Sequence, residues 1–225
     1  MYTKYAIIAA SLLASISVRG STVNWTSSPY PVSGPMGNEL TTGIFNTFGT
    51  LFLAENLGGS DTTFDGINFT AGSFTFSGGT SLDYHRADKS SELSHSGTYG
   101  IAGRPSTVSL TGLTVGDTYR VQALVYDGRN TPGISERRVS FDAADQGRYA
   151  NGVHDVRWGD GLLVTGVFIA DSVIQNFTIE TFDGSISRGG HLNALLVHNT
   201  SRVNKRNSQS LLSIGGITLS LQQTK

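Results

Sequence analysis

The sequence contains no cysteine, and that absence alone removes several classes of protein. A disulfide-linked scaffold, a zinc site with cysteine ligands, an iron–sulfur cluster and a cysteine nucleophile are all excluded. Charged residues are also scarce, at 15% of the chain, and the net charge at pH 7 is −1. Because the chain has no excess of basic residues to attract a phosphate backbone, we expect no nucleic-acid partner.

Catalytic signatures are missing as well. The patterns G-x-S-x-G, H-E-x-x-H, G-x-x-x-x-G-K-[ST] and G-x-G-x-x-G do not occur. Of the few glutamates, Glu55 and Glu180 fall in predicted strands, where they would have to project into one cleft to act as the carboxylate pair of a glycosidase. We favour solvent-facing roles for both. We therefore predict a protein that is not an enzyme, with a polysaccharide-active enzyme as the least favoured alternative.

Turn and strand residues dominate what is present. There are 28 glycines, 27 serines and 24 threonines, and no window beyond the first twenty residues shows a convincing helical stripe. Apolar and polar residues alternate with the period of a half-buried strand in segments 49–57, 66–70, 73–77, 106–110, 119–126, 137–141, 162–169, 175–182 and 192–198. The polar stretch 78–103 is predicted to form long loops. This spacing predicts an all-β fold, an antiparallel β-sandwich or barrel.

Three parts of the chain are predicted from its composition. Residues 1–20 have one lysine, Lys4, before an uncharged apolar run, which is the layout of a signal peptide cleaved after Gly20. That run is too short to span a bilayer, so we expect no transmembrane span in the mature chain. Residues 21–200, which begin with a turn-rich stretch, are predicted to form a single β-sandwich domain. Residues 201–225 form a C-terminal tail. We expect a secreted or cell-surface protein.

The segment LTGLTVGDTYRVQALVYD, residues 110–127, resembles a tyrosine corner. In that arrangement a tyrosine at the start of a strand, here Tyr119, forms a hydrogen bond back to the preceding turn. The pattern is similar to fibronectin type III domains and to jelly-roll modules of the galactose-binding-like type. Because residues 21–200 are far longer than a fibronectin module, the length favours a jelly roll.

Four further stretches resemble parts of exported bacterial β-sandwich proteins. LAENLGG, residues 53–59, is similar to the opening strand of malectin-like jelly rolls. GVFIADSVIQNFTIETF, residues 166–182, and LNALLV, residues 192–197, resemble the closing strands of exported sandwich proteins. SLLSIGGITLSL in the tail resembles a degenerate PEP-CTERM sorting segment that lacks the Pro-Glu-Pro; a last edge strand is the alternative. The resemblance implies a carbohydrate-binding fold.

Three polar segments combine aromatic rings with hydrogen-bonding side chains, the combination that sugar recognition uses. Each also has a structural explanation, such as an Asp-Gly turn or a tryptophan that covers the core. The candidate ligand-binding residues are Tyr84, His85 and Arg86 in the first segment, Tyr126, Asp127 and Arg129 in the second, and His154, Arg157, Trp158 and Asp160 in the third.

A calcium ion is a weaker expectation. Aspartates and loop carbonyls suit a hard cation, and Asp142, Asp145 and Asp160 are the candidate ligands. No complete D-x-D-x-D-G loop is present, and we predict no other cofactor.

The sequence thus favours an exported, noncatalytic β-sandwich that binds carbohydrate or another extracellular polymer. The alternative is a structural or adhesive protein of the cell surface or matrix that self-associates through exposed strand edges.

Overall fold

The computed structural model describes residues 21–33, 39–40, 42–72, 80–83, 93, 96–127, 136–150 and 160–201. An eight-stranded sheet has the order β2 (Glu39–Leu40), β1 (Asn24–Ser33), β12 (Asp160–Ile169), β9 (Thr118–Val125), β16 (Ala194–Asn199), β3 (Thr50–Asn56), β5 (Ile67–Ala71) and β4 (Thr62–Phe64). A five-stranded sheet contains β11 (Ala144–Ala150), β10 (Glu136–Phe141), β13 (Ile174–Asp183) and β14 (Ile186–Gly189), with β8 (Ser106–Thr111) also paired to β13. A small third sheet has the order β15 (His191–Leu192), β7 (Ser96–Tyr99) and β6 (Thr80–Asp83).

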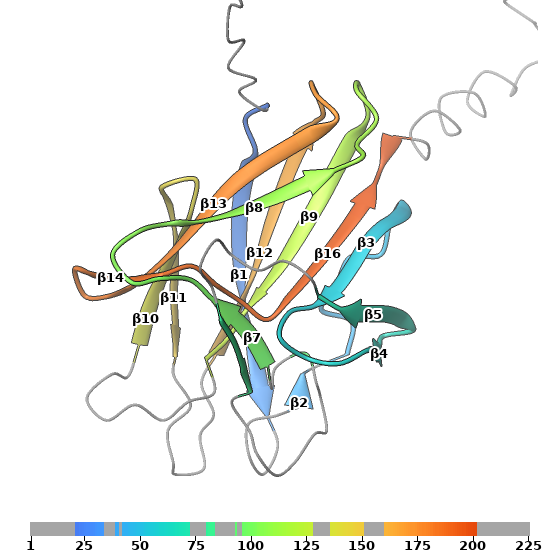
Figure 1. Cartoon of the computed structure of the whole chain (residues 1–225). Coiled ribbons are helices and arrows are strands. Elements are labelled where there is room, and N and C mark those ends of the chain that lie inside the picture. Colours follow the sequence, from blue (N-terminus) through green and yellow to red (C-terminus); the bar gives the residue numbers. More distant parts are fainter. Residues whose placement is uncertain are drawn as a thin grey trace, which may run out of the picture.

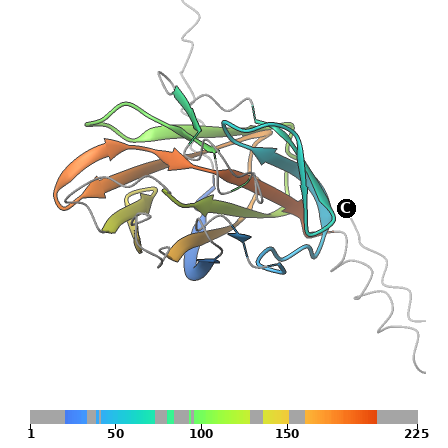
Figure 2. The same ribbon diagram turned by 90° about the horizontal axis from the view of Figure 1, so that it is seen from below.

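The strand order is that of a jelly roll. Four antiparallel pairs are nested along the chain: β10 with β11, β9 with β12, β8 with β13, and β3 with β16. The pairs alternate between the two larger sheets, so that β3, β16, β9 and β12 are neighbours in one sheet and β8, β13, β10 and β11 are neighbours in the other. Figure 1 shows the two groups of strands and Figure 2 shows the layers from below. The predicted antiparallel β-sandwich is confirmed.

The main core lies between the two larger sheets. Alternation along β9 sends Tyr119, Val121 and Ala123 into this core, where they meet Phe141 and Phe177 of the five-stranded sheet. The intervening residues of β9 point to the opposite face of the eight-stranded sheet. A second buried cluster forms on part of that outer face, around Leu124, Leu196, Phe69 and Phe45. Both faces of the central strands are therefore covered over part of their length.

Strands also form in two regions where the sequence shows no strand pattern, one turn-rich and one predicted to form loops. The turn-rich stretch 21–35 includes β1, ten residues long, which pairs with β12 from Asn24 to Pro31. Its last two residues, Val32 and Ser33, pair with β2, so along most of its length β1 is an edge strand, where proline is tolerated. The polar stretch 78–103 contains the paired strands β6 and β7. The sequence does not predict these two strands, because both are mainly polar and neither shows an alternation of apolar and polar residues.

Among the described residues there is no helix that is long and apolar enough to cross a membrane. The predicted signal peptide, residues 1–20, and the tail from residue 202 onward lie outside the described residues.

The tyrosine corner is present. Tyr119 is buried at the start of β9, and its hydroxyl oxygen accepts a hydrogen bond from the backbone N–H of Thr114 at 2.9 Å. Its ring stacks on Phe168 at a centroid separation of 5.6 Å and meets the edge of Phe52 at 5.3 Å. The phenol therefore fixes the turn between β8 and β9, which is the point where the chain crosses from one sheet to the other.

We expect Tyr119→Phe to lower the free energy of unfolding by about 1–3 kcal/mol, because the Thr114 N–H then loses its partner. Denaturant titration measures this change. Tyr30→Phe is the matched control: the Tyr30 hydroxyl is buried and forms no hydrogen bond with any described residue, so its removal should be neutral or stabilising. Equal losses in the two variants would contradict a specific role for the corner.

Candidate functional site

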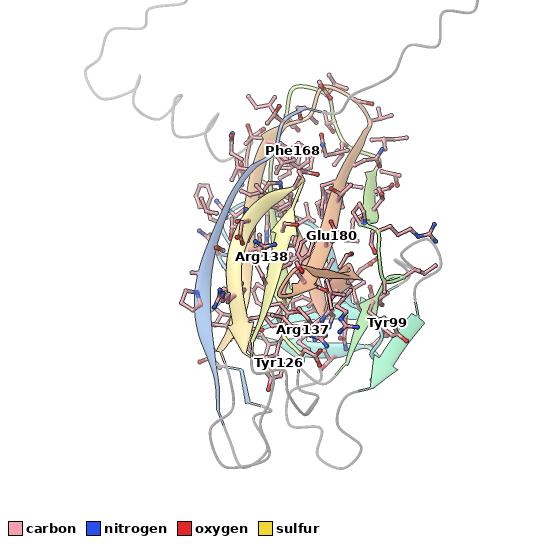
Figure 3. All side chains as sticks on the ribbon, turned by 90° about the vertical axis from the view of Figure 1, so that its left-hand side faces the viewer. Tyr99, Tyr126, Arg137, Arg138, Phe168 and Glu180 are labelled. Atoms are coloured by element: carbon pink, nitrogen blue, oxygen red, sulfur yellow. The ribbon has the colours of Figure 1, made fainter. Side chains whose placement is uncertain are left out.

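Several strands end together at one end of the sandwich. β9 ends where β12 begins, since Val125 pairs with Leu162, and β10 begins where β11 ends, since Glu136 pairs with Ala150. In Figure 3, Tyr126 and Arg137 lie toward this end and Phe168 lies toward the opposite one. In Figure 1, β7 lies toward the end of the molecule at which β9 ends, and β7 pairs with β6. We call this region the Asp127 end.

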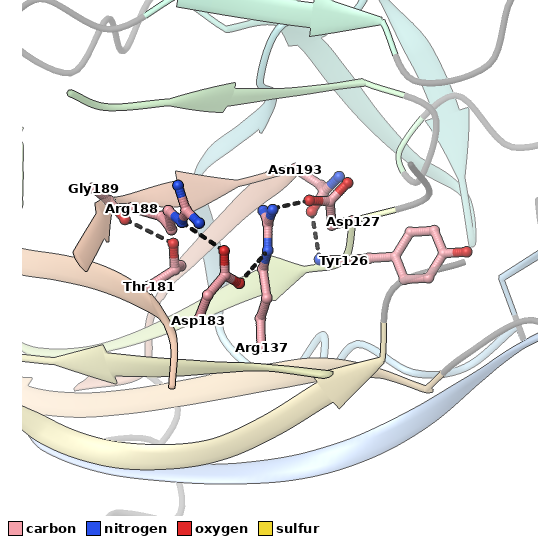
Figure 4. A network of polar contacts seen from close by, with 8 residues as sticks. All are labelled: Tyr126, Asp127, Arg137, Thr181, Asp183, Arg188, Gly189 and Asn193. Atoms are coloured by element: carbon pink, nitrogen blue, oxygen red, sulfur yellow. Dashed lines mark hydrogen bonds and ion pairs between the residues drawn. The ribbon is translucent and has the colours of Figure 1, made fainter. Parts of the chain in front are cut away.

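A chain of ion pairs closes the core at the Asp127 end (Figure 4). Arg137 of β10 donates from Nη1 to Asp127 at 2.6 Å and from Nε to Asp183 of β13 at 3.0 Å. Arg188 of β14 donates to the second oxygen of Asp183 at 2.5 Å. Asp127 is fully buried, while the side chains of Arg137 and Asp183 are each 9% exposed. Acid and base alternate along this chain, so each buried charge has an opposite neighbour.

Asn193 extends the network into the eight-stranded sheet. Its side-chain oxygen accepts a hydrogen bond from the backbone N–H of Tyr126 at 2.6 Å. Its own backbone N–H donates to Leu124 at 2.9 Å, and its carbonyl accepts from Leu57 at 2.8 Å. The fully buried Asn193 thereby joins the start of β16 to the end of β9 and to the residue after β3.

Three buried phenols lie close to one another near this end. Tyr30, Tyr126 and Tyr149 are each at most 4% exposed. Burial raises the pKa of Tyr30 well above its usual value, and the neighbouring phenols of Tyr126 and Tyr149 raise it further. Burial, followed by the charge of Asp127, raises the pKa of Tyr126 above its usual value. The Tyr30 and Tyr126 hydroxyls therefore remain protonated at pH 7, and the Tyr30 hydroxyl has no hydrogen-bond partner among the described residues.

Glu55 carries a carboxyl group with a perturbed pKa. It projects from β3 toward the interior of the sandwich, on the same face as its cross-strand partner Leu195. The residue is 8% exposed, and its Oε2 atom has no partner in the described structure. Burial raises the pKa of Glu55 to about 7. Near neutral pH this group is therefore divided between its protonated and ionised forms.

Glu55 and Glu180 do not form a carboxylate pair. Glu55 lies on the inner face of the eight-stranded sheet, whereas Glu180 lies on the outer face of the five-stranded sheet, between the buried residues Ile179 and Thr181. The Glu180 carboxylate accepts a hydrogen bond from Ser187 at 2.5 Å. With a core layer between them, the two cannot flank one glycosidic bond. Both were expected to face solvent, and that expectation is wrong for Glu55.

The sequence-predicted ligand residues fall into two groups. Tyr126 and Asp127 are described and fully buried: the Tyr126 ring belongs to the second core cluster, and Asp127 pairs with Arg137. Asp160 is the first residue of β12. The remaining seven candidates lie outside the described residues: Tyr84, His85, Arg86, Arg129, His154, Arg157 and Trp158.

The calcium candidates Asp142 and Asp145 take part in a hairpin. Asp142 has a φ of 48° in the turn between β10 and β11, and its carboxylate accepts from the indole N–H of Trp25 at 2.9 Å and from the Thr178 N–H at 2.8 Å. The Asp145 carboxylate accepts from the Gly147 N–H at 2.9 Å. Within the described ranges no three His, Asp or Glu side chains are grouped to hold a metal. Calcium binding stays a prediction.

Arg137, Asp183 and Asn193 are not among the sequence-predicted candidates. A signal for Arg137 exists in the sequence: the period of two puts it on the same strand face as Val139 and Phe141, which are buried. The same alternation relates Asp183 to the buried side of β13. A charged residue in register with a buried row predicts an internal ion pair, whereas the identity of its partner needs the fold.

The Asp127–Arg137 pair should be a major determinant of stability. We expect Asp127→Asn to lower the free energy of unfolding by about 3–5 kcal/mol, because the buried Arg137 guanidinium then keeps only one of its two carboxylate partners, Asp183. Urea denaturation checks this. Asp145→Asn is the control, because its pair with Arg138 is exposed and longer, at 3.5 Å. Equal effects of the two substitutions would contradict the structural role of the buried pair.

Glu55 should make the stability depend on pH. Its folded pKa of about 7 lies above the usual value of 4.5, so folding takes up a proton between these values. The free energy of unfolding should therefore fall as pH rises through this window, by at most about 1.4 kcal/mol per pH unit, and level off above it. Glu55→Gln should remove this contribution and be the more stable protein at pH 8. A variant with unchanged pH dependence would show that Glu55 ionises normally.

No family model and no curated protein matches the chain. Solved structures with a similar arrangement of strands include the ANX2 ectodomain from Arabidopsis thaliana (11% identity, 65% of this chain and 49% of that chain, TM-score 0.44) and the plant receptor-like kinase FER (16% identity, 65% and 41%, TM-score 0.43). A third is β-glucuronidase 2 from Bacteroides uniformis (15% identity, 65% and 17%, TM-score 0.41). The chain spans less than half the length of each. At these identities and TM-scores the likeness does not extend to a ligand or an activity.

Proposed function

We propose that the chain is an exported, noncatalytic jelly-roll module that binds a glycan at the Asp127 end. One observation carries the proposal: the segments containing Arg129 and Trp158 connect strands that end side by side at this end. The strands β6 and β7, which flank the segment containing Tyr84, lie toward it too (Figure 1). Three aromatic and polar segments that are separate in sequence are thereby anchored to one end of a single scaffold.

The buried network supports the proposal by fixing the anchors. Arg137 holds Asp127 at the end of β9 and Asp183 near the end of β13, so the bases of these connections belong to one closely packed unit. Rigid strand ends that present aromatic rings and hydrogen-bonding groups suit a sugar, whose apolar face stacks on a ring while its hydroxyls bind polar side chains.

A noncatalytic role agrees with the positions of the carboxyl groups of Glu55 and Glu180. Glu55 and Glu180 face different sides of different sheets, so the strand glutamates supply no general acid facing a base or nucleophile. The predicted signal peptide supports export.

We expect Trp158→Ala to remove most of the glycan affinity, measured by glycan array with and without calcium, and to leave the melting temperature within a few degrees. The reason is that a stacking ring contributes to binding without belonging to the core. Trp25→Ala is the matched control. The Trp25 ring packs 4.7 Å from Phe141 and 5.2 Å from Phe177, so its removal should lower the melting temperature markedly.

Loss of stability in Trp158→Ala, as large as in Trp25→Ala, would place Trp158 in the core instead. Unchanged binding in a stable variant would exclude Trp158 as the stacking ring. A wild-type protein that binds no glycan in either condition but forms ordered polymers would replace glycan binding with self-assembly.

A further inference from the structure

Arg120 is a half-buried cation with no acidic partner among the described residues. Its Nη1 atom donates to the backbone carbonyls of Asn46 and Phe48, at 3.4 and 3.2 Å, and its guanidinium lies 5.9 Å from the centre of the Phe48 ring. The Nε and Nη2 groups form no hydrogen bond with any described residue. By contrast, Arg137, Arg138 and Arg188 each form an ion pair. Burial lowers the pKa of Arg120 from its usual value, and the group remains charged at pH 7.

Exposed apolar side chains surround this cation. On the outer face of the eight-stranded sheet, cross-strand pairing places Val167, Arg120, His198 and Leu51 in one row. Val167 is 38% exposed, Leu51 is 49% exposed, and the Phe48 ring beside Arg120 is 45% exposed. Adjacent strands are about 4.8 Å apart, so the row is about 15 Å long. It therefore offers one charge within an apolar surface.

Two buried polar groups lie beside Arg120 on the same face. His198 is 3% exposed and Gln122 is 1% exposed. Neither Nδ1 of His198 nor Oε1 of Gln122 has a hydrogen-bond partner among the described residues. Burial, followed by the charge of Arg120, lowers the pKa of His198, so the imidazole is neutral at pH 7 and does not compensate the guanidinium. The site thus has unused hydrogen-bonding capacity as well as an unpaired charge.

We propose that this row, from Val167 to Leu51 with Phe48, is a docking site for a segment of a partner protein that carries a carboxylate between apolar side chains. A carboxylate can accept two hydrogen bonds from the free N–H groups of Arg120. The flanking apolar groups then cover Val167, Leu51 and Phe48. An arginine surrounded by aromatic and aliphatic contacts has the composition of a protein-interface anchor.

The site is separate from the Asp127 end. Arg120 and Tyr126 are six residues apart along β9 and its continuation, which corresponds to about 20 Å of extended chain. The docking proposal is thus independent of the glycan proposal, and a protein partner and a glycan can bind together.

The test uses two blocked tripeptides, N-acetyl-Leu-Asp-Leu-amide and its Asn analogue, titrated into the ¹⁵N-labelled protein and followed by NMR. We expect the Asp peptide to shift the Arg120 side-chain and neighbouring backbone signals and to bind at least about tenfold more tightly than the Asn peptide. Equal binding of both peptides, or no binding of the Asp peptide, would overturn the proposal. Equal binding of galacturonate, which has the carboxylate without the apolar groups, would overturn it as well.

The decisive variant is Val167→Asp. Position 167 lies directly across from Arg120, so the new carboxylate satisfies the guanidinium without removing its bonds to Asn46 and Phe48. We expect Val167→Asp to lower the affinity for the Asp peptide by about tenfold or more, and the neutral Val167→Asn to lower it much less. Arg120→Gln should lose binding, whereas Arg104→Gln, at an exposed arginine elsewhere, should keep it. Equal affinities of Val167→Asp and Val167→Asn would contradict the role of the charge.

Discussion

The contact between Arg137 and its two acidic neighbours links the layers of the molecule. Asp127 belongs to the end of the eight-stranded sheet, while Arg137 and Asp183 belong to the five-stranded sheet, so the Asp127–Arg137 pair crosses the interior. A chain without cysteine has no covalent link for this purpose. Apolar contacts close most of the core without fixing the lateral position of one sheet on the other, whereas a buried ion pair requires specific atoms to meet. The separation of the sheets at this end depends on this pair.

Local periodicity in the sequence predicts the strands correctly where one face of the strand lies in the core. The alternation in 119–126, 162–169 and 175–182 reflects strands with one face in a continuous core, and the tyrosine corner at Tyr119 is a local motif with its partner only five residues away. The jelly roll was reached through length and resemblance rather than through pairing. β1 was missed because its alternating rows contain prolines, serines and threonines, and its stability comes from its partner β12.

The candidate site was harder to predict for a physical reason. An aromatic residue beside an aspartate has the same local pattern whether it binds a sugar or fills a core, and Tyr126 with Asp127 is buried. Only the position of Arg137, which approaches from another sheet, distinguishes the two cases. The outer-face row around Arg120 could not be predicted from the sequence either, because it consists of residues from four strands that are distant along the chain.

The nesting of the four strand pairs has a consequence for how the chain reaches this structure. The innermost pair, β10 with β11, is joined by the tight turn at Asp142 and Ala143, whereas the outermost, β3 with β16, joins residues as far apart in the chain as Thr50 and Asn199. If the outer pair formed first, the long segment between its two strands would lose conformational entropy before the inner pairs had formed. Once an inner pair has formed, each further pair closes a much shorter free loop. Assembly from the central hairpin outward is therefore the route with the smallest entropic barrier, and β3 and β16 should be among the last strands to become protected from hydrogen exchange during refolding.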